Sequence, residues 1–246
     1  MTERACIIAI DGPAGAGKST VAKHLAAHFG FLNLETGAMY RAFALKAQEH
    51  GVDVDDAAAL QHLAAETAIK LEPSEAGNRV LLDGVDVTGR IRDAEVTRGA
   101  SRVSVHPAIR AWMVKLQRAL GKNARVVMEG RDIGTVVFPH ADLKFFLDAS
   151  PEARSQRRYE QTAPVSGAMD GAGAATDGRA RDSQAAITKE LRERDERDRN
   201  RAESPLRAAA DAIVIDSTNM TLNEVLKFIE DQVEQHLRLP VVNEEL

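Results

Sequence analysis

The sequence is poor in the features that would place it outside the ordinary globular proteins. It has one cysteine, Cys6, in an apolar run, so no internal disulfide can form and a buried thiol in a reducing compartment is expected. Trp112 is the only tryptophan, and we expect it in core packing. No apolar run approaches the length of a membrane span. The N-terminal segment holds about six apolar residues before Asp11, too few for a signal peptide, so we expect a cytoplasmic protein without a membrane partner.

The chain also lacks an excess of positive charge. It carries 32 basic and 37 acidic residues, a net charge of −5, which argues against non-specific binding to nucleic acid. Arginine nevertheless makes up 23 of the 32 basic residues, and its planar fork pairs bidentately with phosphate or carboxylate. Eleven of these arginines fall between Arg154 and Arg207, among many acids. That run fits a solvated helix with many ion pairs as well as it fits a set of anion ligands.

The order of apolar segments predicts an α/β fold. With 246 residues, 44% of them hydrophobic, the chain can form one large domain or one domain carrying an insert. Strands are predicted at 5–10, 31–34, 125–128, 143–147 and 212–215. Helices are predicted at 19–29, 39–50, 55–67, 107–120, 150–161 and 183–201, and from Thr221, with Glu224 as a capping box, to about 237. Five apolar strands linked by helices predict a parallel sheet covered on both faces.

Two segments depart from this alternation. Short strands are predicted at 68–71, 79–82 and 85–88, with Asp83 and Gly84 as a hairpin turn, so we expect a small inserted subdomain at about 65–100. The stretch 162–182 is rich in Gly, Ala and Ser, which predicts a flexible loop. We read it as a mobile lid extension that is not itself a site. The single domain 1–246 would then have a core of 1–64, 101–160 and 183–246.

Residues 12–19, G-P-A-G-A-G-K-S, match the phosphate-binding pattern G-x-x-x-x-G-K-[ST] at every fixed position. They follow a predicted strand and open a predicted helix, so backbone N–H groups and the helix dipole converge on a phosphate chain. Lys18 is expected to reach the β- and γ-phosphates, and Ser19 to hold Mg²⁺. The predicted ligands of the nucleotide here are Gly12, Pro13, Ala14, Gly15, Ala16, Gly17, Lys18, Ser19 and Thr20.

The place of the site follows from where the predicted strands end. The pairs Asp11-Gly12, Glu35-Thr36, Glu129-Gly130 and Asp216-Ser217 stand at the carboxyl ends, the edge at which parallel sheets bind ligands. The guanine-reading pattern N-K-x-D does not occur in the sequence, which disfavours a GTPase. The seven histidines show no metal-ligand spacing that we recognise, and we expect them in surface or capping roles. They are His24, His28, His50, His62, His106, His140 and His236.

Three further segments narrow the class. They are G-A-M-Y-R at 37–41, E-G-R-D-I-G-T-V-V-F-P at 129–139 and R-D-E-R-D-R-N-R at 194–201. Together with the phosphate loop and D-S-T at 216–218, they make the chain resemble the bacterial cytidylate kinases over its whole length. The resemblance implies a P-loop NTPase fold with an enlarged acceptor-binding region. It also implies transfer of the ATP γ-phosphate to CMP or dCMP, with Mg²⁺, and we expect a monomer.

The resemblance also implies roles for charged residues. Arg41 and Arg131 would grip the acceptor phosphate, while Arg194 and Arg201 would lie nearer the transferring group. The expected catalytic residues are Lys18, Arg131, Arg194 and Arg201. Asp198 would bind the ribose, although its spacing from Arg194 and Arg201 on one helix face suits a salt bridge equally. Arg192, Arg197 and Arg199 would point elsewhere.

Base recognition is assigned in the same way. Ser101, Arg110 and Asp132 match family positions that contact cytosine, and a carboxylate accepts from the exocyclic amine of cytosine but disfavours the carbonyl of uracil. Thr36 stands where many members have Ser, and it keeps a hydroxyl for a phosphate or ribose contact. On the donor side, Arg154, Arg157 and Arg158 are expected to serve ATP.

Two alternatives stay open on the sequence. One is a kinase of the same fold that acts on UMP or another small acceptor, against which Asp132 argues. The other is an ATP-binding module without catalysis. Such a module would not need the arginine set on the lid and the charged helix.

Overall fold

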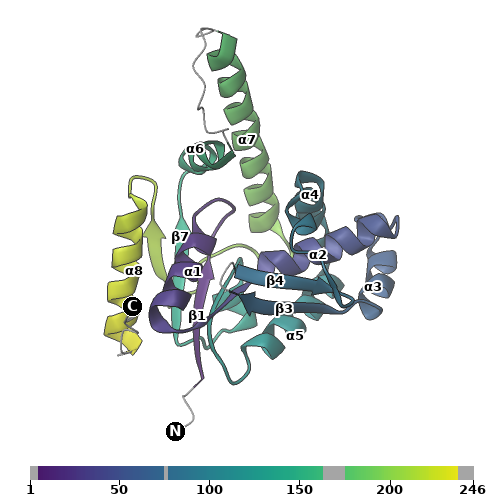
Figure 1. Ribbon diagram of the computed structural model, residues 1–246, viewed down its shortest axis with the longest axis horizontal. Coiled ribbons are helices and arrows are strands. Elements are labelled where there is room, and N and C mark those ends of the chain that lie inside the picture. The colour runs from purple at the N-terminus through teal and green to yellow at the C-terminus, as the bar shows by residue number, and fades with distance from the viewer. Residues whose placement is uncertain (1–4, 75–76, 163–174, 238–246) are drawn as a thin grey trace.

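The computed structural model describes residues 5–74, 77–162 and 175–237, and it has the expected α/β architecture (Figure 1). Its main sheet is parallel throughout, with the strand order β2-β6-β1-β7-β8. The strands of this sheet are β1 (Cys6–Asp11), β2 (Leu32–Glu35), β6 (Arg125–Gly130), β7 (Leu143–Asp148) and β8 (Ile213–Asp216). All five were predicted within a residue or two of these bounds.

Helices cover both faces of this sheet. They are α1 (Lys18–Phe29), α2 (Thr36–Glu49), α5 (Pro107–Gly121) and α8 (Leu222–Leu237), while α3 (Ala57–Ala65) packs against α2 and α5. Ile8 belongs to one core cluster with Leu25 of α1 and Ile229 of α8. The next residue, Ala9, belongs to the opposite cluster with Met39 of α2. The alternation of side chains along a strand thus feeds two separate cores. Among the described residues, no helix has the length and apolarity needed to span a membrane.

The residues that the sequence indicates as helix starts stand at helix starts in the structure. Pro107 occupies the first turn of α5, where its missing N–H costs nothing. Thr221 and Glu224 form the capping box of α8, since the Thr221 amide donates to Glu224 at 2.7 Å and the Glu224 amide to the Thr221 hydroxyl at 3.3 Å. Cys6 is buried, as expected. Trp112 packs on the core with its ring edge-on to Phe43, 5.1 Å away.

A small antiparallel sheet lies beside the main one. It consists of β3 (Ile69–Ser74), β4 (Gly77–Leu82) and β5 (Val85–Asp86), in that order, and its strands were predicted. Asp83 and Gly84 both have positive φ, 50° and 84°, in the turn between β4 and β5. A 3₁₀ turn, η1 (Arg90–Arg92), and the helix α4 (Ala94–Val103) follow.

The helix α4 was not predicted. Only Val96, Ala100 and Val103 of its apolar side chains are buried, and they stand at helical spacing in an otherwise polar stretch. The helix packs on α2. Its burial therefore depends on a neighbour 50 residues away in the sequence, and this contact brings Ser101 to the acceptor side of the sheet.

Two helices rise above the carboxyl edge of the sheet. They are α6 (Pro151–Thr162) and α7 (Ala175–Asn200), which pack against each other. In Figure 1, α7 projects from the body while its C-terminal end lies over the sheet. The prediction of a flexible loop over 162–182 is wrong for 175–182, which form the first turns of α7; the Ala and Arg residues there are good helix formers. The rest of that loop, 163–174, lies outside the described residues.

Candidate active site

The phosphate loop connects β1 to α1 and is shaped by glycine. A Cβ on Gly12, whose φ is +148°, would lie 2.0 Å from the Leu147 carbonyl oxygen of β7, so only glycine lets the loop pass that strand. Gly17 precedes α1 with φ of 95°, a left-handed conformation that also favours glycine. The loop therefore presents its backbone at the start of a helix, where N–H groups are free to meet an anion.

Lys18 is buried at the base of this loop, with 6% of its surface exposed. Its ammonium donates to the Pro13 carbonyl at 2.7 Å, which holds the side chain along the inside of the loop. Burial and the nearby positive charges of Arg131 and Arg194 lower the pKa of Lys18 to about 7. A negatively charged ligand would reverse this balance, because it would favour the charged ammonium.

One pocket opens on the α8 side of the loop. It has a volume of about 640 Å³. It is lined by 15–21, by Arg157 and Arg158 of α6, by the loop that precedes α8 and by the first turn of α8. Arg157 is anchored there, donating to the Ser217 hydroxyl at 3.1 Å and to the Ser217 carbonyl at 2.5 Å. Of the predicted donor-side residues, 15–20, Arg157 and Arg158 are thus brought together, whereas Gly12, Pro13 and Ala14 do not line this pocket: Gly12 lies against β7 and Ala14 lines the second pocket.

A second pocket, the acceptor pocket, has a volume of about 200 Å³ and opens on the other side of the loop. The predicted acceptor-side residues all line it: Thr36, Arg41, Ser101, Arg110, Arg131, Asp132, Arg194, Asp198 and Arg201. The two pockets share Gly15, Lys18 and Ser19. A ligand in one pocket would therefore meet a ligand in the other at the phosphate loop.

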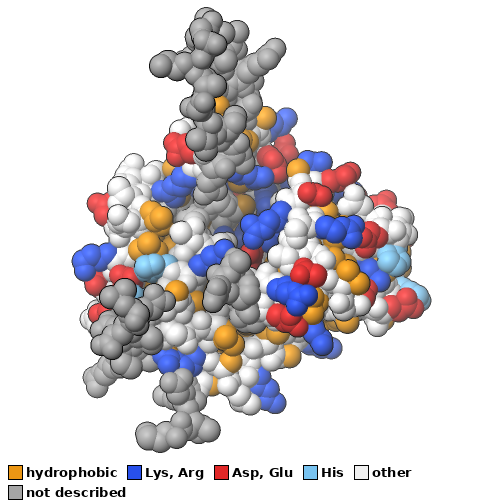
Figure 2. Space-filling model, viewed as in Figure 1, with side chains coloured by type: hydrophobic (Ala, Val, Ile, Leu, Met, Phe, Trp, Pro, Cys, Tyr) orange, Lys and Arg blue, Asp and Glu red, His pale blue; other side chains and the backbone are white. Residues whose placement is uncertain are grey.

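The second pocket is rich in buried guanidinium groups that are only partly satisfied. The Nε atoms of Arg41, Arg110, Arg194 and Arg201 are buried and have no hydrogen-bond partner among the described residues. Burial and the adjacent Arg131 lower the pKa of Arg194 to about 10. Figure 2 shows blue side chains gathered around the hollow beneath α7. Such groups are costly to bury unless an anion compensates them, so this pocket suits a phosphate.

Asp198 organises part of this cluster. Its carboxylate accepts from Arg131 Nε at 2.9 Å and lies 3.6 Å from a terminal nitrogen of Arg201. The pKa of Asp198 is lowered although burial opposes this, because Arg131 and Arg201 stabilise the carboxylate. The salt bridge that the sequence allowed is therefore present, and it orients two of the predicted catalytic arginines; the ribose contact of Asp198 stays a prediction.

Arg110 and Asp132 form a buried pair at the far end of the pocket. A guanidinium nitrogen of Arg110 donates to Asp132, and a second donates to the Ser104 carbonyl at 3.2 Å. The Arg110 group lies 5.9 Å from the centre of the Tyr40 ring. These contacts fix the two side chains in place, so they form a polar end wall with defined donors and acceptors.

The structure corrects one expectation for the charged helix. Arg197 does not point away from the cleft, because it donates to the Ser101 hydroxyl at 2.6 Å. The sequence could not show this contact, since α4 was not predicted. Arg192 and Arg199 do pair outside the pocket, with Glu152 and Asp148. Thr36 donates its hydroxyl proton to the Glu129 carbonyl at 2.7 Å, which leaves its oxygen as an acceptor.

Glu129 is a site residue that the sequence indicates only as the end of a strand. It is 4% exposed, lines the acceptor pocket and contacts the Ser19 hydroxyl. Its Oε1 has no hydrogen-bond partner among the described residues, and burial raises its pKa. Nearby, Asp11 accepts from the amides of Ile133 and Gly134 at 2.8 and 2.7 Å, which fixes the segment after Asp132 to β1.

Arg154 was expected to serve ATP, but its guanidinium is committed to the protein. The side chain is 1% exposed, and it donates to the carbonyls of Ala149 and Ala14 at 2.8 Å each. It also forms a bidentate pair with Asp195 of α7. Arg154 thus links the phosphate loop to α7. It lines the first pocket, but its guanidinium is already paired within the protein.

The expectation for the histidines also needs correction. His24 and His28, one turn apart on α1, meet Glu230 of α8 so that the three groups could hold a metal ion. The spacing H-x-x-x-H on a helix was a signal for this, but the sequence could not show that Glu230 faces it.

Comparison with known proteins gives consistent likenesses. The family model described as cytidylate kinase matches residues 8–235. A cytidylate kinase of Solibacter usitatus is 45% identical over 94% of this chain and 95% of its own. Cytidylate kinases of Pelotomaculum thermopropionicum and Aeromonas salmonicida are 49% and 43% identical, over 92% and 96% of this chain and 95% and 97% of theirs.

Among solved structures, a shikimate kinase from Acinetobacter baumannii in complex with shikimate has a TM-score of 0.38 and 14% identity. The match covers 95% of this chain and 93% of that one. Likeness at this level is too distant to inform function.

Proposed function

The chain belongs to the cytidylate kinase family, and from this premise we propose how its two pockets divide the work. It is a nucleoside monophosphate kinase that transfers the γ-phosphate of ATP to CMP or dCMP. The products are ADP and CDP or dCDP. The assignment of substrates to pockets and of roles to residues is our proposal, and the observation that carries it is the sharing of Lys18 by both pockets.

ATP would bind in the larger pocket with its phosphates on the loop 12–19. Backbone N–H groups at the start of α1 would surround the β- and γ-phosphates. Arg158 lines the wall of this pocket, as does Arg157, which is anchored to Ser217. The γ-phosphate would then lie at the mouth of the smaller pocket, next to the Lys18 ammonium.

CMP would bind in the smaller pocket with its phosphate among Arg41, Arg131 and Arg194. Their partly unsatisfied guanidinium groups would neutralise the dianion and hold one oxygen in line with the γ-phosphorus. That oxygen attacks phosphorus as the bond to the bridging oxygen of ADP breaks. Lys18, Arg131, Arg194 and Arg201 would balance the charge that spreads over the transferring group.

The opposite end of this pocket would read the base. The buried Arg110–Asp132 pair fixes a carboxylate that can accept from the cytosine amine, and Arg110 can donate to the ring nitrogen or the carbonyl. A uracil carbonyl at the same place would face the carboxylate without a proton between them. Ser101, oriented by Arg197, completes this wall.

The residues present also fit Mg²⁺. The Ser19 hydroxyl contacts Glu129, whose buried Oε1 lacks a partner among the described residues, so an oxygen ligand set for a hard cation stands beside the phosphate loop. We propose that Ser19 holds the ion and that Glu129 supports it. When bound, Mg²⁺ would neutralise phosphate charge.

We further propose that the enzyme acts as a monomer in the cytoplasm. Most of the exposed large apolar side chains of the described residues lie on different elements, and only Leu222 and Phe228 share one, the helix α8. Single exposed apolar residues of this kind do not form an interface.

The proposal is tested by ADP release with ATP and Mg²⁺ over CMP, dCMP, UMP, AMP and shikimate. We expect CMP and dCMP to be phosphorylated with kcat/KM at least about tenfold above UMP, from one good polar contact to the base. Lys18→Ala should lower kcat by orders of magnitude while the fold is retained. ATP binding without transfer to any acceptor, or a preference for UMP, would contradict the proposal.

A further inference from the structure

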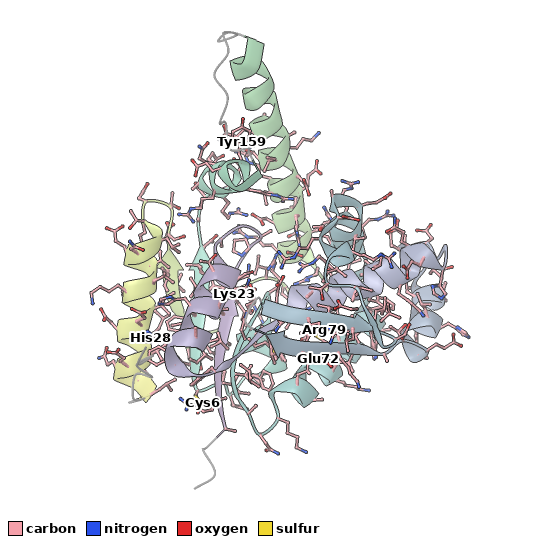
Figure 3. The ribbon with its side chains drawn as sticks, viewed as in Figure 1. Cys6, Lys23, His28, Glu72, Arg79 and Tyr159 are labelled. Carbon is pink, nitrogen blue, oxygen red and sulfur yellow. The ribbon has the colours of Figure 1, made fainter. Side chains whose placement is uncertain are left out.

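Three potential metal ligands converge between α1 and α8, on the sheet face away from the acceptor pocket. The rings of His24 and His28 stack with their centroids 5.9 Å apart and their planes at 19°. The Glu230 carboxylate contacts His24 Nε2 and lies 3.7 Å from His28 Nδ1. One ligand atom from each residue lies within 4.8 Å of the other two. Figure 3 shows His28 on α1, beside α8.

We propose that His24, His28 and Glu230 bind a divalent transition-metal ion, for which Zn²⁺ is the best match. Two imidazole nitrogens and one carboxylate oxygen are a ligand set that Zn²⁺ uses, with water in the fourth position. Histidines four residues apart on a helix present their nitrogens on one face. Mg²⁺ and Ca²⁺ prefer oxygen ligands throughout, so this set selects against them.

The three ligand atoms lie within 4.8 Å of one another, so small side-chain movements would bring them to the spacing that a bound ion needs. With bonds of about 2.0–2.2 Å in a tetrahedral arrangement, ligand atoms lie roughly 3.3–3.5 Å apart. The pair of His28 and Glu230, at 3.7 Å, is already near this value. The direct contact of His24 with Glu230 must open to admit the ion. The side chains of His24 and Glu230 are 37% and 23% exposed, so both have room to move.

An ordinary ion pair does not account for the second histidine. A contact between Glu230 and His24 alone would satisfy both groups, yet His28 turns toward the same carboxylate. Its ring is held there by edge-on packing against Phe29, 4.6 Å away. On α8, the neighbouring Lys227 is paired with Asp231 at 3.2 Å, so its charge is partly neutralised. Two neutral imidazoles and one carboxylate leave a negative charge that a dication would compensate.

The bound ion would tie α1 to α8. Since α1 begins with Lys18 and the first turn of α8 lines the larger pocket, the tie would stabilise the fold on the donor side. His24 lies six residues after Lys18, or about 9 Å along the helix. The ion would therefore not touch the phosphates, and the inference is independent of the proposed function.

The test is titration calorimetry of the full chain, stripped of metal with a chelator, with Zn²⁺ alone in a buffer free of phosphate. We expect one tight site per chain in the wild type, and at least tenfold weaker binding in His24→Ala and in His28→Ala. These side chains are partly exposed, so both variants should fold. His62→Ala, an exposed histidine on α3, is the matched control and should bind as the wild type does.

Thermal unfolding gives a second readout. At a Zn²⁺ concentration about one hundred times the Kd, linkage predicts that Tm of the wild type rises by roughly 5–10 °C. The double variant His24→Ala/His28→Ala should show no such rise. Equal Zn²⁺ affinity in the wild type and the double variant, or a shift in Tm that survives the double substitution, would overturn the proposal.

Discussion

Lys18 stands where the two pockets meet, and its surroundings determine its charge. It is buried beside Arg131 and Arg194, so the ligand-free site disfavours the ammonium form. The free energy of unfolding should accordingly gain a contribution from Lys18 as the pH rises from about 7 toward 10.5, because the unfolded chain binds more protons in that range. Bound nucleotide phosphates would raise the pKa of Lys18 again, so that its amine regains a proton.

Binding of MgATP at pH 8 should therefore take up a proton. With a pKa of about 7, Lys18 is mostly neutral before binding, so the uptake should approach about 0.9 proton per site. Calorimetry in buffers of different ionisation enthalpy measures this number. Lys18→Arg, which stays charged at pH 8, should bind without uptake. An uptake below about 0.2 proton in wild-type protein that binds MgATP normally would contradict this account of Lys18.

Asp132 should set the choice of base. Asp132→Asn keeps the shape and an oxygen for Arg110, but it replaces an acceptor by a donor that can meet a uracil carbonyl. We expect the ratio of kcat/KM for CMP to that for UMP to fall roughly 5- to 150-fold, which corresponds to a loss of about 1–3 kcal/mol of discrimination. Asp231→Asn, at an exposed position of α8, is the control and should leave the ratio unchanged. An unaltered ratio in folded Asp132→Asn would show that the carboxylate does not read the base.

The sequence pointed to Arg41, Arg131, Arg194 and Arg201 because a distinctive segment carries each of them, and all four line the acceptor pocket. It did not predict what they contact. The spacing of Asp198 allowed a salt bridge, which the structure shows with Arg131 and Arg201, while its contact with the ribose stays a prediction. Glu129 and Arg154 were misjudged because burial and long-range partners, which the sequence does not contain, determine their state.

At the scale of elements, a buried contact links α7 and its arginines to the phosphate loop. The Arg154–Asp195 pair is nearly inaccessible, and Arg154 also binds the Ala14 carbonyl of the loop. The Arg192–Glu152 pair joins α6 and α7 as well, but both its side chains are about 60% exposed. The first pair therefore fixes the helix, while the second contributes little.

Asp195→Asn should lower kcat by at least about tenfold, equivalent to about 1.4 kcal/mol, with KM for ATP within about threefold. The loop still forms, but Arg194, next to Asp195 in the chain, loses its fixed position. Arg192→Gln is the matched control on the exposed pair and should behave as the wild type does.

Loss of stability has to be separated from loss of position. Breaking a buried pair costs about 3–5 kcal/mol, so Tm of Asp195→Asn should fall. If Asp195→Asn does not fold, Asp195→Glu, which keeps the charge but displaces it, serves instead. A lowered Tm with wild-type kcat would show that the pair only stabilises the fold.

The elements themselves were largely predictable, for a physical reason. Buried parallel strands read as apolar runs, and helices such as α5 and α8 carry capping residues in the sequence. The helix α4 was missed because few of its residues are apolar, and its stability depends on packing against α2. The start of α7 was misplaced because Gly and Ala suggested a loop, although Ala and Arg in the same stretch favour a helix.

At the scale of the whole molecule, positive side chains from distant parts of the sequence gather in one place in the fold. The chain is acidic overall, with a net charge of −5, yet the acceptor pocket gathers Lys18 and several arginines. The net charge argued against non-specific binding to nucleic acid, but the composition gave no sign of this local positive field. The fold creates it by bringing α2, the end of β6 and the C-terminal end of α7 to one edge of the sheet, beside the phosphate loop.

The most direct test of this account is a crystal structure with Mg²⁺, CMP and an ATP analogue whose β,γ-bridge is an imido group. The account predicts the triphosphate on the loop 12–19, the CMP phosphate among Arg41, Arg131 and Arg194, and the cytosine amine against Asp132. The γ-phosphorus should lie next to Lys18 and in line with an oxygen of CMP. A CMP molecule bound outside the smaller pocket, or bound there with its base at the arginines and its phosphate at Asp132, would contradict it.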